Sequence, residues 1–337
     1  MKREFQLSSR REFFGSSAST LAILGTIAAQ RHQAGAQTKP EPFAHDLSRY
    51  QKTDPKLISH EEVARWKSPR PEPKRFGIGP DDTLYICAGN YVTAMSPTGQ
   101  RGLEIALSGP ACCVAVEKSG EIFVGLRDRV EVFDAKGQRK ATWESPGKKA
   151  WLTGIALTEK DVFVADAGGR VLLRYDKSGK LIRRLGERDN VRNIPGFVIP
   201  SPFLDVEIAR DGLLRINNPG RHRVETYTFD GDFEGAWGKP TAAIQGFCGC
   251  CNPINLALLP DGRFVTCEKG LPRVKIYSAT GEFESVVAGV ETFAENGKAC
   301  GPTDCTAGGL DAVVDSQGRI CILDFVTGDV RLMKAKA

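Results

Sequence analysis

The sequence predicts an all-β fold, a six-bladed β-propeller built from four-stranded antiparallel blades. Short apolar segments recur along the chain, and turns rich in glycine and aspartate separate them. The glycines that end the later turn of successive units lie 38, 42, 52 and 50 residues apart, at Gly99, Gly137, Gly179, Gly231 and Gly281. Repeats of about 40–50 residues that each contain several short strands are typical of propeller blades.

Six such units follow one another between Arg75 and Met333. Each begins with an inner apolar strand, and the six inner strands are expected at 76–78, 114–116, 155–157, 206–208, 256–258 and 312–314. Later strands are expected at 84–86, 122–124, 130–133, 162–164, 264–265, 274–277 and 320–322. The last unit ends after its third strand, at 330–332. We therefore expect residues 57–66, which alternate in polarity, to supply the missing outer strand and close the ring.

This pattern of repeats resembles the NHL-repeat family of six-bladed β-propellers. The resemblance covers nearly all of the chain from Arg75 to Met333. It implies an architecture and no particular reaction, since most NHL-repeat modules bind other proteins.

Residues 1–36 have the features of an export signal. The segment Ser9-Arg10-Arg11-Glu12-Phe13-Phe14 resembles the twin-arginine motif, an apolar run follows at 21–29, and residues 34–36 fit a cleavage site. The resemblance implies export of a folded protein to the periplasm or beyond. The apolar run is shorter than the roughly 20 residues that span a bilayer, so no permanent membrane anchor is expected after cleavage. The domains are then a signal (1–36), an extension (37–74) and the propeller (75–337).

Composition excludes one class of partner. The formal net charge is +5, and the predicted signal carries +3 of it. The remaining charge is small, and cations and aromatics do not cluster as a nucleic-acid surface requires, so no nucleic-acid partner is expected. The chain has ten cysteines, none in the signal. In an exported protein these favour disulfides as well as metal sites.

Propeller geometry predicts where the cysteines lie, because loops between blades and loops after second strands open on one face. Cys248, Cys250 and Cys251 precede the fifth inner strand, and Cys300 and Cys305 precede the sixth. Cys112 and Cys113 precede the second, whereas Cys87 and Cys267 end second strands. Nine cysteines are thus expected on one face. The long insertions at 187–202, 239–253 and 290–308 also open there, which is typical of a binding face.

Three hypotheses fit this cluster. In the first, Cys248, Cys250, Cys251, Cys300 and Cys305 are thiolate ligands of a metal ion or an iron–sulfur cluster, with Cys112, Cys113 and Cys267 as further candidate ligands. In the second, the same residues form disulfides that join the two long insertions. In the third, an adjacent pair, Cys112-Cys113 or Cys250-Cys251, is a redox centre.

A ring of strand-initial residues is expected at the channel mouth. Counting back seven residues from the first turn of each unit gives Phe76, Cys113, Gly154, Asp205, Asn255 and Asp311. Aspartate and asparagine in such positions also cap turns. Asp205, Asn255 and Asp311 are loosely similar to the calcium ligands of six-bladed propellers related to gluconolactonases, a resemblance that implies lactone hydrolysis. The first blade lacks the acidic residue of that family.

These observations lead to one functional hypothesis and two alternatives. The first is an exported propeller with a cysteine-rich metal or iron–sulfur site that serves a periplasmic redox or metal-delivery protein. The alternatives are a non-catalytic interaction propeller held together by disulfides, and a calcium-dependent, lactonase-like hydrolase.

Overall fold

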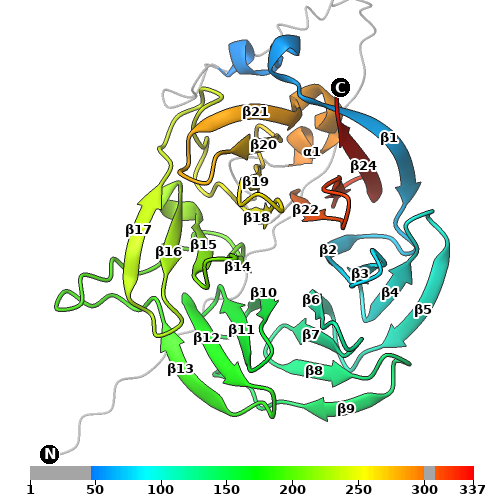
Figure 1. Ribbon diagram of the computed structural model, residues 1–337, viewed down its shortest axis with the longest axis vertical. Coiled ribbons are helices and arrows are strands. Elements are labelled where there is room, and N and C mark those ends of the chain that lie inside the picture. Colours follow the sequence, from blue (N-terminus) through cyan, green and yellow to red (C-terminus); the bar gives the residue numbers. More distant parts are fainter. Residues whose placement is uncertain (1–46, 300–307) are drawn as a thin grey trace, which may run out of the picture. The chain divides into compact units, whose positions relative to one another are not determined.

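The computed structural model describes residues 47–299 and 308–337. The predicted export signal, the first part of the extension, and Cys300 and Cys305 lie outside the described residues. Within the unit that spans Asp46–Ala337, six four-stranded antiparallel sheets surround a central channel (Figure 1). The predicted six-bladed propeller is therefore confirmed.

The blades take their strands from the chain in order. Blades one to three comprise β2 (Pro73–Ile78), β3 (Leu84–Ala88), β4 (Tyr91–Met95), β5 (Arg101–Ala106), β6 (Ala111–Val116), β7 (Ile122–Leu126), β8 (Val130–Phe133), β9 (Arg139–Thr142), β10 (Leu152–Leu157), β11 (Asp161–Asp166), β12 (Val171–Asp176) and β13 (Leu181–Leu185). Blades four and five comprise β14 (Val206–Ile208), β15 (Leu214–Asn218), β16 (Arg223–Tyr227), β17 (Phe233–Trp237), β18 (Asn255–Leu258), β19 (Phe264–Cys267), β20 (Val274–Tyr277) and β21 (Phe283–Ala288).

The sixth blade joins the two ends of the propeller. Its inner strands are β22 (Leu310–Val314), β23 (Ile320–Asp324) and β24 (Asp329–Ala335), and its outer strand is β1 (His60–Lys67). Strand β1 runs antiparallel to β24, from the pair His60–Ala335 to the pair Lys67–Asp329. Most of the segment expected to close the ring, residues 57–66, thus lies in the outer-strand position, while its first residue belongs to the short helix at Pro55–Leu57.

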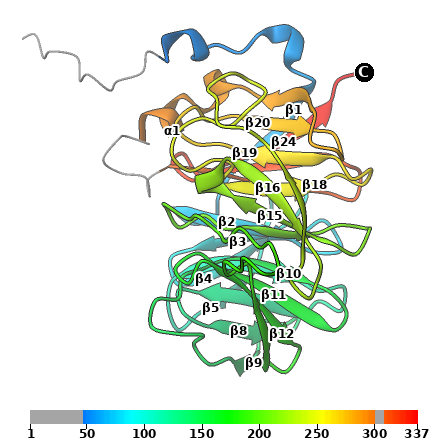
Figure 2. The same cartoon turned by 90° about the vertical axis from the view of Figure 1, so that its left-hand side faces the viewer.

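Helices are few and short. They are η1 (Ser48–Tyr50), η2 (Pro55–Leu57), η3 (Pro219–Arg221), η4 (Val290–Phe293) and α1 (Ala294–Ala299). Figures 1 and 2 both place η1 and η2 (blue) beside β21, where Ser59 N donates a hydrogen bond to Val286 O (2.9 Å). In the part of the chain that the structure describes, no helix is long and apolar enough to cross a membrane.

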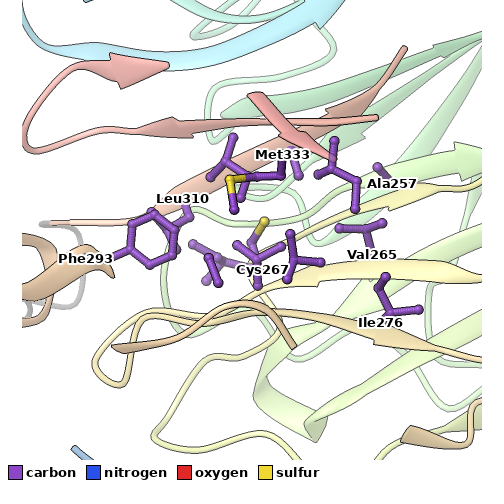
Figure 3. Packing of buried hydrophobic residues seen from close by; sticks show 14 of the residues in the cluster. Ala257, Val265, Cys267, Ile276, Phe293, Leu310 and Met333 are labelled. Carbon is purple, nitrogen blue, oxygen red and sulfur yellow. The ribbon is translucent and has the colours of Figure 1, made fainter. Parts of the chain in front are cut away.

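The core consists of apolar layers between neighbouring blades. Figure 3 shows the layer between blades five and six, where Val265 and Ile276 face Leu310 and Met333 around the thiol of Cys267. Successive strand residues point to opposite faces of a sheet. Neighbouring blades cover both faces of the middle strands, which is why strands such as β7 and β11 are buried along their whole length, whereas outer strands such as β9 and β13 are largely exposed.

The regular glycines have a packing cause. Each late-turn glycine has a positive φ and receives a side chain from the outer strand of the preceding blade or from the residue that follows that strand. Trp66, Trp143 and Trp237 cover Gly99, Gly179 and Gly281 in this way. A Cβ atom on Gly281 would lie 2.2 Å from Cγ of Trp237, closer than atoms can approach. The contact therefore requires glycine for its size as well as for its backbone conformation.

Candidate functional site

Arg75 takes the channel-mouth position of the first blade, and the expectation of Phe76 is wrong by one residue. Arg75 pairs with Cys87 in the β2–β3 ladder, just as Cys113 pairs with Gly125 in the second blade. In most blades glycine has the left-handed conformation in the first turn, whereas in the first blade Asp82 has it (φ 62°). Aspartate tolerates this conformation, so the turn contains no glycine to mark its register.

Arg75 lies between two carboxylates. Its guanidinium forms an ion pair with Asp205 of the fourth blade, and its Nε atom is 3.3 Å from Asp311 Oδ2 of the sixth. Burial opposes the charge on Arg75, but the two carboxylates outweigh it and raise the pKa of the guanidinium. Burial raises the pKa of Asp311 to about 6, although Arg75 acts in the opposite direction. A cation of the chain itself thus already pairs with Asp205 and Asp311, two of the residues proposed as calcium ligands.

The predicted ring residues also tie the inner strands of adjacent blades together. Asp205 Oδ2 accepts a hydrogen bond from Leu256 N (3.1 Å), and Asp311 Oδ2 accepts one from Phe76 N (3.1 Å). The side chain of Asn255 donates to Leu310 O (2.6 Å). These bonds satisfy the backbone at the start of the inner strands. The ring residues therefore have a structural role, since they hold the inner strands of adjacent blades together.

Below Arg75 the channel holds a cavity of about 260 Å³, whose wall is formed by the inner strands. Besides Asp205 and Asp311 of the ring, the cavity is lined by one further acidic residue, Glu207. No hydrogen bond or ion pair joins the Glu207 carboxyl to the described residues. Burial, reinforced by the nearby Asp205 charge, raises the pKa of Glu207 to about 8. This carboxyl is therefore largely protonated at neutral pH.

Above Arg75 lies a larger cavity of about 440 Å³, which we call the funnel. Its described lining consists of Lys74, Arg75, Pro110, Ala111, Cys112, Arg127, Trp151, Thr153, Pro202, Phe203, Gly308 and Phe325. Arg75 alone lines both cavities. The guanidinium of Arg127 stacks on the ring of Trp151, 4.2 Å from its centroid, which orients both side chains.

The funnel combines positive charge with aromatic surface. Three cations line it, at Lys74, Arg75 and Arg127, and its described lining contains no carboxylate. Apolar walls with a few convergent polar groups are typical of small-molecule sites. Burial raises the pKa of the Cys112 thiol to about 11, against the influence of Arg127 and Lys74. This thiol is therefore protonated at neutral pH and is a poor nucleophile.

The cysteine loop, residues 248–251, is held against the fifth blade. Cys248 N donates to Glu268 Oε1 (3.2 Å), and Asn252 Nδ2 donates to Cys248 O (2.6 Å). His222 Nε2 donates to Gly249 O (2.6 Å), which ties the loop to the fourth blade as well. The Sγ atoms of Cys250 and Cys251 lie 3.2 Å apart, with Cys250 exposed and Cys251 only 2% exposed.

Buried charges anchor the insertion that carries this loop. Glu268 accepts hydrogen bonds from Arg273 (2.7 Å), and Lys275 Nζ lies 3.0 Å from Glu268 Oε2. Lys275 also donates to Ile244 O (3.1 Å) and Gly246 O (2.6 Å) in the insertion. Burial lowers the pKa of Lys275 to about 8, although Glu268 opposes the shift. A fully desolvated network of this kind fixes the backbone that precedes the cysteines.

Lys269 links the cysteine loop to the funnel. Its backbone N–H donates to Asn252 Oδ1 (2.9 Å), and its carbonyl accepts from Asn252 Nδ2 (2.9 Å). Its ammonium lies 4.6 Å from the ring centroid of Phe203, which lines the funnel. The two features therefore share one side of the propeller.

The structure distributes the other predicted cysteines differently. Cys112 lines the funnel and Cys113 lines the channel, so these neighbours in strand β6 do not face one another. Cys267 and Cys87 are fully buried among apolar side chains between blades. No group of three histidine, cysteine or acidic side chains in residues 47–299 and 308–337 is placed to hold a metal ion. Cys300 and Cys305 lie outside these ranges, so the five-cysteine site stays a prediction.

The comparisons with known proteins give the fold. No family model matches the sequence, and no curated protein matches it. A solved structure of a streptogramin B lyase is similar over 83% of this chain and 99% of that chain, with a TM-score of 0.56 and 12% identity. The virginiamycin B lyase of Staphylococcus aureus is similar over 82% of this chain and all of its own, with a TM-score of 0.54 and 13% identity. A catalytically inactive variant of that lyase, solved with quinupristin, gives a TM-score of 0.53 at 13% identity, over 82% of this chain and 99% of that one.

Proposed function

We propose that the chain binds a small organic anion with an aromatic or apolar part in the funnel above Arg75. One observation carries the proposal: Arg75 Nη1 is buried and has no hydrogen-bond partner among the described residues, and Arg75 lines both the funnel and the channel cavity. A buried, unpaired N–H group costs about 1–3 kcal/mol unless a water or a ligand oxygen accepts from it. A carboxylate or phosphate oxygen at the funnel floor would complete its hydrogen bonding.

The walls support the same class of ligand. Lys74 and Arg127 are exposed and add positive charge at the rim, while Trp151, Phe203 and Phe325 offer ring faces. Aromatic faces and cations together favour an anion attached to a flat or apolar group. Binding rather than catalysis is proposed, because the described lining offers a protonated thiol and no histidine or carboxylate as a base.

Thermal stability in the presence of ligand pairs tests this function. Phenylacetate and its neutral amide, phenylacetamide, differ only in the charged group. We expect phenylacetate to raise the melting temperature of the chain and phenylacetamide to raise it much less, because ligand bound to the native state stabilises it. The rise in melting temperature should be much smaller in Arg127→Met, because that variant binds the anion more weakly. Arg129→Met is the matched control, since Arg129 is also exposed but pairs with Asp128 (3.1 Å) and does not line the funnel.

The similar lyases suggest a second activity that this funnel supports less well. The S. aureus virginiamycin B lyase is inactive in a variant in which one histidine is replaced by alanine. No histidine lines the described part of the funnel here. A lyase or hydrolase activity would therefore need a different base. The calcium-dependent lactonase is disfavoured by Arg75, which pairs with Asp205 and Asp311.

The export and metal hypotheses stand as further proposals. We propose export through the twin-arginine pathway, on the sequence pattern given above. A metal or iron–sulfur site at Cys248, Cys250, Cys251, Cys300 and Cys305 is the competing hypothesis for the cysteine loop, on the spacing of these residues in the sequence. The rigid cysteine loop supports some specific use of these thiols.

A further inference from the structure

Cys250 and Cys251 differ from every other neighbouring pair of thiols in the described chain. Their Sγ atoms lie 3.2 Å apart, within reach of one another. Cys112 and Cys113 are also adjacent in sequence, but they belong to strand β6, whose pairing with β7 shifts register between Ala111 and Cys113. One of that pair lines the funnel and the other the channel. Only in the cysteine loop, therefore, does the described backbone turn adjacent thiols toward each other.

The loop is also preorganised for this contact. Asn252 binds the carbonyls of Cys248 and Lys269, and Glu268 binds the amide of Cys248. Glu268 in turn belongs to the buried ion network that fixes the insertion. The backbone between these anchors includes Gly249 with φ +82°, a conformation that glycine adopts without strain. The approach of the two sulfurs is thus set by the fold around them.

The two thiols differ in access. Cys250 is exposed, whereas Cys251 is only 2% exposed. In thiol–disulfide exchange an accessible thiolate attacks first, and a second thiol then resolves the mixed disulfide. An exposed thiol 3.2 Å from a buried one can supply these two roles, the exposed thiol as the attacking group and the buried thiol as the resolving group.

We propose that Cys250 and Cys251 form a dithiol that exchanges with disulfides, with Cys250 as the attacking thiol and Cys251 as the resolving thiol. Cys250 attacks one sulfur of a disulfide substrate, forming a mixed disulfide and releasing one thiolate, which takes up a proton. Cys251 then attacks the Cys250 sulfur, forming the Cys250–Cys251 disulfide and releasing the second thiolate. The substrate disulfide gains two electrons and two protons, and the Cys250–Cys251 pair loses the same number.

Mass mapping with glutathione disulfide as the probe tests this proposal on the full chain. The reduced protein is exposed to glutathione disulfide, its remaining thiols are blocked with N-ethylmaleimide, and its peptides are sequenced. In the wild-type protein we expect the peptide with Cys250 and Cys251 to be two hydrogens lighter and to carry no N-ethylmaleimide, because the two thiols have formed a disulfide. Cys112 and Cys113 should form no bond with each other. This measurement needs no variant and so does not depend on variant folding.

The variants separate the two roles. Cys251→Ser should accumulate a stable mixed disulfide with glutathione on Cys250, because the resolving thiol is missing. Cys250→Ser should form at least tenfold less adduct at Cys251, since that thiol is buried. Cys248→Ser is the matched control and should still form the Cys250–Cys251 bond. Blocking of both thiols in the wild type, a bond from Cys250 to Cys300 or Cys305, or a metal ion that protects all three loop thiols would each overturn the proposal.

Discussion

Arg75 of the first blade forms an ion pair with Asp205 of the fourth, so two inner strands on opposite sides of the propeller are joined through its channel. The same guanidinium reaches Asp311 of the sixth blade at 3.3 Å. It thereby closes the funnel from below and separates it from the channel cavity. One side chain thus serves both the stability of the ring and the floor of the proposed binding site.

Replacing Arg75 by methionine should destabilise the propeller. The substitution leaves Asp205 and Asp311 buried without their cation, and removing one partner of a buried ion pair costs about 3–5 kcal/mol. The free energy of unfolding from urea denaturation measures the loss. The triple variant Arg75→Met, Asp205→Asn, Asp311→Asn is the control and should recover a substantial part of it. Equal stability of Arg75→Met and the wild type would show that the pair does not support the ring.

Glu207 should make stability depend on pH. Its pKa rises from 4.5 to about 8 on folding because of burial in the channel, so the folded state favours the protonated form. Stability from this group is complete below pH 4.5 and is lost as the pH rises through about 8. Glu207→Gln should therefore melt like the wild type at low pH and at a higher temperature than the wild type above pH 8. Parallel melting curves across the whole pH range would contradict this.

Two glycines with the same backbone conformation test the contacts between blades. Gly262 and Gly281 have φ +88° and +87°, but a Cβ on Gly262 meets only Ala279 at 3.9 Å, whereas one on Gly281 meets Trp237. Gly262→Ala should cost about 1–2 kcal/mol for the left-handed conformation alone. Gly281→Ala should cost roughly 1–3 kcal/mol more because of overpacking. Chemical denaturation of both variants measures the difference, and equal costs would remove the packing argument.

Metal analysis separates the hypotheses for the cysteine loop. If thiols 248, 250 and 251 hold a metal or an iron–sulfur cluster, protein isolated from its native compartment should contain it in stoichiometric amount, and Cys248→Ser should remove it. If Cys250 and Cys251 are an exchanging dithiol, the protein should contain no stoichiometric metal. Cys248→Ser should then leave the metal content and the Cys250–Cys251 disulfide unchanged. Elemental analysis together with thiol counting gives the answer.

The sequence predicted the blades because their signals are local. Most inner strands are short apolar runs. The regular glycines mark turns that require a positive φ and leave no room for a Cβ atom. The one error of register came from the first blade, where Asp82 replaces the glycine and shifts the count from Arg75 to Phe76. Aspartate can adopt the left-handed backbone conformation, so Asp82 could have been recognised in the sequence as the turn residue that replaces glycine.

The cysteines were harder to place, because a small buried thiol behaves as an apolar side chain. Cys87 and Cys267 end strands that open toward the expected face, yet both pack inside blade interfaces. The funnel could not be predicted at all. Its lining comes from five blades and from loops of different lengths, so Arg127 and Trp151 become neighbours only after folding.

The quenching of Trp151 fluorescence tests the central claim most directly. Trp151 lines the funnel, whereas Trp66, Trp143 and Trp237 pack against glycine turns between blades. Titration with phenylacetate should give saturable quenching that Trp151→Phe removes, and Arg127→Met should weaken binding by about tenfold or more. Phenylacetamide should bind far more weakly. Equal affinity for the acid and the amide, or quenching that survives Trp151→Phe, would contradict an anion site in the funnel.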